Sequence, residues 1–119
     1  MSFDPVEFLK VSNELLAGNT EAHYRSLINR AYYAAFGHIR NKLSISNNRG
    51  SVHREVILRL KTSRSLEEAK AGAALELLFK RRKECDYDHH KPVKSYQCEY
   101  NIREAEKIIE LFNQSRLAI

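Results

Sequence analysis

The segment from Arg81 to His90 holds the residues best suited to chemistry in this sequence. Six residues separate Arg82 from His89, so both side chains could face one phosphate group if the helix carrying the arginine unwinds before the histidine. An arginine binds such an anion through bidentate hydrogen bonds, and a histidine that titrates near neutral pH can move a proton. The pair therefore favours cleavage of a phosphodiester bond, with Arg82 and His89 as the catalytic residues.

Polar and aromatic neighbours of this pair are the expected substrate contacts. They are Arg81, Lys83, Tyr87 and His90. Spacing alone does not identify a site, because an arginine and a histidine at such a separation occur roughly once by chance in a chain of this composition.

A purely structural interpretation of the same residues stays open. Arg82 is expected near an exposed helix end, where the helix dipole favours a cation. Asp86 would pair with Arg81 or Arg82, and Tyr87 would pack on the end of the protein. In that interpretation His89 and His90 are solvated loop residues.

Capping residues and apolar periodicity divide the chain into helices that must position these groups. Asp4 caps a first helix that runs to Gly18, and Thr20 begins a longer central helix. Further helices are expected over 52–61, from Ser65 to about 85–87, and from a cap at Ser95 onward. The inward stripe expected for the helix that follows Ser65 is Leu66, Ala69, Ala73, Leu77 and Leu78. No strand pattern competes, which predicts an all-α protein, a four-helix up-and-down bundle plus a short additional helix.

Composition limits the class of protein. The chain has 119 residues, 43% of them hydrophobic, which predicts one domain over residues 1–119. No apolar run is long enough to cross a bilayer and the first residues lack a signal-peptide pattern, so we expect a cytoplasmic protein without a membrane partner. The net charge of +5 is concentrated in residues 40–64, which hold seven basic residues and one acidic residue. Such a surface suits a nucleic acid or a nucleotide, or is simply a solvated face.

Two other groups of residues could bind a ligand, one a zinc ion and the other nucleic-acid bases. Cys85, His89, His90 and Cys98 contain the ligand types of a zinc site, but their spacing fits no common structural site, so we expect no metal and no cofactor. Tyr32, Tyr33 and Phe36 could stack on bases, although aromatic residues on a central amphipathic helix more often form core or a dimer interface.

Two segments of the chain resemble a known family. The segment 24–36, YRSLINRAYYAAF, is similar to the second helix of HEPN domains, the higher eukaryote and prokaryote nucleotide-binding family. The segment 82–88, with Arg82, three residues, then Asp86 and Tyr87, resembles the end of a later helix of that family. His53, just inside the short third helix, also matches, so the resemblance covers nearly the whole chain.

The resemblance implies a function as well as a fold. HEPN domains are helical bundles that usually form homodimers, and many are metal-independent ribonucleases in which an arginine is followed by four to six residues and a histidine. Arg82 and His89 fit that allowance. The chain would then be an RNA endonuclease that leaves a 2′,3′-cyclic phosphate, as the toxin of a toxin–antitoxin or antiviral system. The family's toxins place histidine before tyrosine, whereas here Tyr87 precedes His89.

That exchange supports an alternative function. In it the chain is a non-catalytic HEPN module that binds RNA or a nucleotide and partners a nucleotidyltransferase or an antitoxin.

Overall fold

Every regular element that the structure describes is a helix, which confirms the all-α prediction. The structure is a computed structural model that describes residues 3–46 and 49–117. A short 3₁₀ helix, η1 (Pro5–Glu7), leads into α1 (Phe8–Leu15), followed by α2 (Glu21–Lys42) and α3 (Val52–Lys61). The last two helices are α4 (Leu66–Tyr87) and α5 (Ser95–Leu117). None of the described helices is both long and apolar enough to span a membrane.

Side-chain caps start three of these elements. Asp4 Oδ1 accepts a hydrogen bond from the Val6 N–H (3.1 Å), as its predicted capping role requires. The Thr20 hydroxyl accepts from the N–H of His23 (3.3 Å) at the start of α2. Ser65 accepts from the N–H of Glu68 (3.3 Å), which confirms the predicted cap of α4. Two boundaries differ from expectation, because α1 ends at Leu15 before Gly18 and α5 begins at Ser95 itself.

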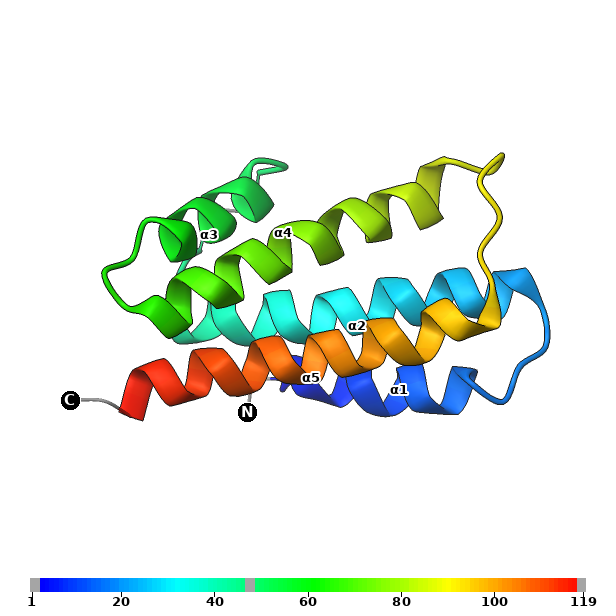
Figure 1. Cartoon of the computed structure of the whole chain (residues 1–119), viewed down its shortest axis with the longest axis horizontal. Helices are drawn as coiled ribbons and strands as arrows, with labels where there is room; N and C mark the ends of the chain where they lie inside the picture. Colours follow the sequence, from blue (N-terminus) through cyan, green and yellow to red (C-terminus); the bar gives the residue numbers. More distant parts are fainter. Residues whose placement is uncertain (1–2, 47–48, 118–119) are drawn as a thin grey trace.

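Helix α2 is the centre of the molecule. It packs against α1, α4 and α5, while α3 lies on α4 at the end of the molecule where α4 begins (Figure 1). The larger of two apolar clusters joins α2, α3, α4 and α5 around Tyr32, Leu75 and Phe112. A smaller cluster lies toward the other end of α2 and includes Leu27, Cys85 and Cys98. Tyr32 and Phe36 are buried in the larger cluster, as expected for core residues, whereas Tyr33 is partly exposed.

The buried stripe of α4 is not the predicted one. Leu66, Ala73 and Leu77 are exposed. Of the predicted stripe only Leu78 is buried, and Ala69 is half-buried. The other buried residues of α4 are Ala71, Gly72, Leu75 and Cys85. Apolar residues lie on more than one side of this helix, so periodicity alone could not choose its inner face. At Gly72 the absence of a side chain lets Leu60 and Lys61 of α3 approach closely.

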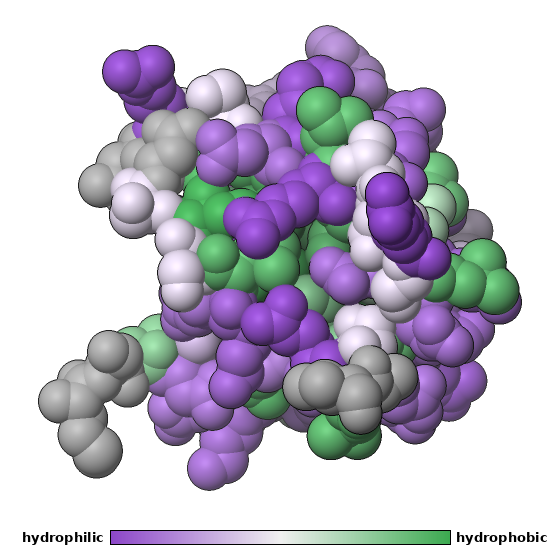
Figure 2. All heavy atoms as spheres, turned by 90° about the vertical axis from the view of Figure 1, so that its left-hand side faces the viewer, coloured by the Kyte–Doolittle hydropathy of each residue, from purple (hydrophilic) through white to green (hydrophobic). Residues whose placement is uncertain are grey.

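The basic segment 40–64 lies at the end of the molecule formed by the last turn of α2, α3 and the start of α4. Seen from this end, hydrophilic side chains surround a small recessed apolar area (Figure 2). The exposed basic residues of the segment are Lys42, Arg49, Arg54, Arg59, Lys61 and Arg64.

Candidate functional site

Three consecutive basic residues on α4 face three different neighbours. Successive residues on a helix are about 100° apart, so Arg81, Arg82 and Lys83 cannot share one face. Arg81 lies toward α5, Arg82 toward α2 and Lys83 toward α3. The residues that the sequence grouped as one site are therefore divided among three surfaces.

Arg82 is enclosed by α2. Its Nε lies 3.1 Å from Oδ2 of Asp86 in an ion pair, although the Nε–H is not aligned for a hydrogen bond. Its Nη2 donates to the hydroxyl of Tyr33 (2.9 Å), and the guanidinium lies 5.2 Å from the centre of that ring. Only 14% of the Arg82 side chain and 25% of the Asp86 side chain is exposed. The predicted pairing with Asp86 is confirmed, whereas the expectation that Arg82 is exposed near the helix end is wrong, because its side chain packs against Tyr33 of α2.

Asp86 is the centre of this polar network. Its Oδ2 accepts a hydrogen bond from the Asn29 amide (3.0 Å) in addition to facing Arg82. Its backbone oxygen lies 3.3 Å from Nε2 of His89, which is exposed on the loop after α4. No direct contact joins Arg82 and His89 among the residues that the structure describes. The predicted catalytic pair is thus connected through Asp86 alone.

The loop after α4 is fixed to α2 by Arg25. The guanidinium of Arg25 donates to the carbonyl oxygens of Cys85 (2.8 Å), Asp88 (3.2 Å) and Lys91 (2.7 Å). These bonds satisfy carbonyl groups that the helix end leaves without partners. They place His89 and His90 on an anchored loop, with the side chains of both exposed to solvent.

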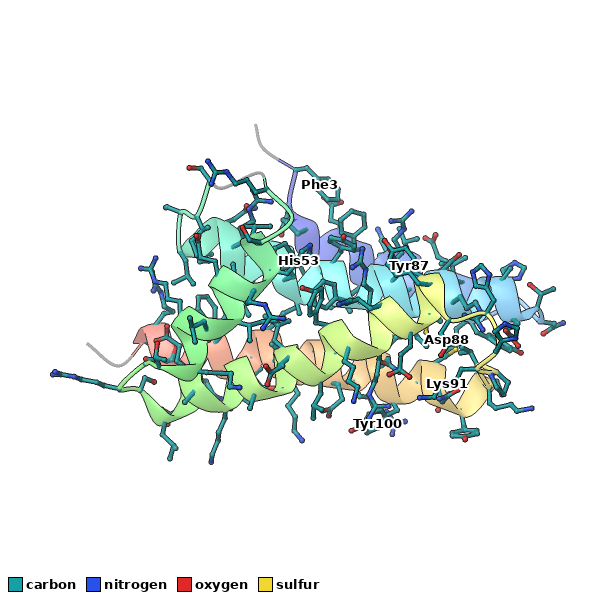
Figure 3. The ribbon with its side chains drawn as sticks, turned by 90° about the horizontal axis from the view of Figure 1, so that it is seen from above. Phe3, His53, Tyr87, Asp88, Lys91 and Tyr100 are labelled. Carbon is teal, nitrogen blue, oxygen red and sulfur yellow. The ribbon has the colours of Figure 1, made fainter. Side chains whose placement is uncertain are left out.

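Lys83 and Tyr87 border a groove between α3 and α4. The groove has a volume of about 550 Å³. Its lining includes Arg54 and Ile57 from α3 and Phe79, Lys80, Lys83 and Tyr87 from α4. Phe79, Lys83 and Tyr87 follow one another at four-residue intervals, so they form one stripe along α4. Figure 3 shows Tyr87 and His53 on one side of the α4 ribbon and Lys91 and Tyr100 on the other.

A histidine that was not placed in the predicted site supports the floor of this groove. The ring of His53 stacks between Phe36, with a centroid distance of 4.3 Å, and Phe79, at 5.0 Å. Its Nδ1 lies 2.7 Å from the hydroxyl of Tyr32. Lys83 Nζ lies 5.2 Å from the centre of the Phe79 ring. The sequence shows that Tyr32 and Phe36 are four residues apart on α2. Their contact with His53 could not be predicted, because it depends on how α3 packs.

The position of His53 sets its charge. Burial, and after it the nearby positive charges of Arg82 and Arg40, together lower the pKa of His53 to about 4. At neutral pH the imidazole is therefore uncharged. Burial also raises the pKa of its partner Tyr32, which keeps the phenol protonated.

The residues considered for zinc do not come together. Cys85 and Cys98 are buried in the smaller apolar cluster, whereas His89 and His90 are exposed. Within residues 3–46 and 49–117, no three histidine, cysteine or acidic side chains form a group that could hold a metal ion. Burial raises the pKa of the Cys85 thiol to about 11, which makes it a poor nucleophile.

Comparisons with known proteins do not assign a family. No protein-family model matches the chain, and no significant match was found among curated proteins or solved structures. The likeness to HEPN domains therefore rests on the residues quoted above, and the function has to be argued from the geometry around α4.

Proposed function

We propose that this chain is a HEPN-like domain that binds single-stranded RNA in the groove between α3 and α4. In this proposal α1, α2, α4 and α5 form the four-helix up-and-down bundle, and α3 is the additional helix that makes the second wall of the groove. A homodimer and a nucleotidyltransferase or antitoxin partner belong to the same proposal and follow from the resemblance alone.

The observation that carries the proposal is the stripe formed by Phe79, Lys83 and Tyr87. Proteins bind single-stranded nucleic acids by stacking bases on aromatic rings and by placing cations along the backbone. Phe79 and Tyr87 are eight residues apart, so about 12 Å of helix separates them and Lys83 lies midway. Tyr87 is 72% exposed, and a base could stack on it without any rearrangement of the core.

The groove is lined by three basic and three acidic residues, and most of the acidic charge is already paired. Glu76 pairs with Lys61 (2.8 Å) and Glu84 with Lys91, whereas Asp88 accepts a hydrogen bond from the N–H of His90. Arg54, Lys80 and Lys83 make no ion pair within the part of the chain that the structure describes. Their charges are therefore available to phosphate groups, and Arg54 connects the groove to the basic segment 40–64.

Fluorescence anisotropy with a labelled single-stranded RNA tests the proposal. We expect Tyr87→Ala to weaken binding by about fivefold to 150-fold, because one stacked base contributes about 1–3 kcal/mol. Lys83→Gln should weaken binding and reduce its dependence on salt, because one phosphate contact is lost. Tyr96→Ala is the matched control, since Tyr96 is 76% exposed but lies on α5 and outside the groove.

Equal losses in the Tyr87 and Tyr96 variants would contradict a site in this groove. An affinity that does not change between low and high salt would contradict phosphate contacts altogether.

Cleavage of the bound RNA is a second candidate function, favoured by the shared contact of Arg82 and His89 with Asp86. In this reaction His89 takes the proton of a ribose 2′-hydroxyl, and the oxygen attacks the adjacent phosphorus. The bond to the 5′-oxygen breaks, that oxygen receives a proton, and a 2′,3′-cyclic phosphate remains. Arg82 would stabilise the charge on the phosphate.

The cleavage assay uses EDTA, single-stranded RNA and the matching DNA. Activity that produces cyclic phosphate ends, spares DNA and falls at least 100-fold in His89→Ala would establish the reaction. His90→Ala is the control, because its side chain is equally exposed but lacks the contact with Asp86. RNA that is bound but never cut would exclude cleavage, and RNA binding would remain as the proposed function.

A further inference from the structure

A second, smaller pocket lies between α4, α5 and the loop that joins them. Its volume is about 270 Å³, and Figure 3 shows Lys91 and Tyr100 on this side of α4. The lining includes Ile28, Leu77, Cys85 and Val93, with Arg81 and Asn101 among the polar residues.

Asn101 provides an unused hydrogen-bond acceptor in the lining. The residue is 1% exposed, and its Nδ2 donates to the backbone oxygen of Gln97 (2.6 Å), which fixes the orientation of the amide. Its Oδ1 has no hydrogen-bond partner within the described part of the chain. Buried polar atoms in native proteins almost always have a partner, so this oxygen calls for an N–H or O–H donor.

The lining of the pocket is also positively charged. Lys80, Arg81 and Lys91 lie among its lining residues, against the single acidic residue Glu84, which is already paired with Lys91. The guanidinium of Arg81 is held over the ring of Tyr100, 5.2 Å from its centre. These cations favour a ligand with a carboxylate or a phosphate group.

The wall contributed by the loop is held in place before any ligand arrives. Arg25 fixes the loop by donating hydrogen bonds to the backbone oxygens of Asp88 and Lys91. Val93 is buried in the smaller apolar cluster. A preformed pocket loses less free energy on binding, because no loop has to be ordered.

We propose that this pocket binds a small organic anion that also carries a hydrogen-bond donor. The donor pairs with Oδ1 of Asn101, a flat or aliphatic middle lies against Ile28, Leu77 and Val93, and the anion faces Lys80 and Arg81. The volume is below the range of about 300–1,000 Å³ that holds drug-sized ligands, which limits the ligand to about one ring. This pocket and the RNA groove lie against different parts of α4 but share Lys80 and Glu84 in their linings, so Arg81, Asn101 and Val93 are the residues that distinguish this site.

Four matched probes test the proposal by NMR on the full chain. They are 4-hydroxyphenylacetate, phenylacetate, 4-hydroxyphenyl phosphate and phenyl phosphate. We expect at least one hydroxylated probe to give saturable shifts at the side-chain amide of Asn101 and the backbone of Val93. The corresponding probe without the hydroxyl should bind about tenfold more weakly, the effect of one lost hydrogen bond to a buried acceptor. The carboxylate and phosphate arms distinguish the two kinds of anion.

Substitutions then test the separate contributions of the Asn101 amide and the Arg81 charge to binding. Asn101→Leu keeps a similar volume and should remove the preference for the hydroxylated probe, and Arg81→Gln should weaken both members of a pair equally. Asn113→Leu is the matched control, because Asn113 is exposed on the same helix and contacts only His38. The proposal is overturned if neither hydroxylated probe shifts the pocket residues, if paired probes bind equally, or if Asn101→Leu retains the preference.

Discussion

The two sides of α4 near its end use similar residues in opposite ways. On the side facing α2, the charge of Arg82 is met by Asp86 and Tyr33, and little of it is exposed. On the side facing α3, Lys83 and Tyr87 are exposed beside an open groove. The difference teaches that position in a sequence motif does not decide how open a basic residue is to a ligand: Lys83 makes no ion pair in the described residues, whereas a phosphate at Arg82 would have to compete with Asp86 and Tyr33.

Burial explains why the α2 side is closed. A guanidinium that loses most of its water must regain hydrogen bonds and an opposite charge, or the folded state becomes less stable. Tyr33 on α2 and Asp86 on α4 supply these partners, and Asn29 in turn donates to Asp86. Lys83 keeps its water and needs no partner, so a phosphate can bind it without displacing an existing pair.

Removing the Arg82 charge on the side of α4 that faces α2 should give the largest loss of stability. Arg82→Ala leaves the Asp86 carboxylate partly buried without its cation, and we expect a loss of about 2–4 kcal/mol in the free energy of unfolding. The value lies below that of a fully buried pair because water still reaches both groups. Urea unfolding followed by circular dichroism measures it.

A double-mutant cycle with Asp86→Ala isolates the pair from other effects of truncation. The two substitutions together should cost clearly less than their separate effects added. If Arg82→Ala unfolds within about 0.5 kcal/mol of the original chain, its network contributes no stability and the arginine is reserved for function.

The next effect concerns the contact that places α3 beside α4. A Cβ added at Gly72 would lie 2.8 Å from the backbone nitrogen of Lys61 and 2.7 Å from Cβ of Leu60. Gly72→Ala should therefore push α3 away and cost about 1–3 kcal/mol by overpacking. Thermal unfolding measures the loss, with Gly50→Ala as the matched control because a Cβ there meets nothing within 4 Å.

RNA affinity of the Gly72 variant sharpens the comparison further. The groove depends on the spacing of α3 and α4, so binding should change together with stability. A Gly72→Ala protein as stable as the Gly50→Ala protein would show that the two helices separate freely.

A smaller effect should appear with pH at the floor of the groove. The pKa of His53 is about 4 in the folded chain against an ordinary value of 6.5, so between these values the unfolded state binds a proton that the folded state does not. The contribution of His53 to stability is complete above about pH 6.5 and is lost as the pH falls toward 4. Arg82, Arg40 and Tyr32 are the groups that face this imidazole.

Urea midpoints between pH 7.5 and 5.5 measure this dependence. His53→Gln should flatten the fall in stability, whereas His90→Ala should leave it in place because that side chain is solvated. A slope that is the same with and without His53 would mean that the imidazole is protonated in the folded state.

Local signals predicted most of the helices and few of the contacts between them. The caps at Asp4 and Ser65 are local hydrogen bonds, and so is the pairing of Arg82 with Asp86 one turn apart, which is why each was visible in the sequence. The division of Arg81, Arg82 and Lys83 among three faces follows from helix geometry, but which neighbour each face meets depends on how the helices pack. The contact of His53 with Phe79 and the exposure of Leu77 depend on how distant helices pack. No local sequence pattern predicts either feature.

The smallest change in stability is expected on the side of α4 that faces α3, where Tyr87 is exposed. Tyr87→Ala removes a ring that is mostly exposed, so the free energy of unfolding should change by no more than about 0.5 kcal/mol, as it should in Tyr96→Ala. Urea unfolding at two protein concentrations measures both variants. A loss in Tyr87→Ala as large as that in Arg82→Ala would show that the ring is packed in solution. If that loss grows with protein concentration, a second copy of the chain covers the ring, and the groove would then be an interface before it is a site for RNA.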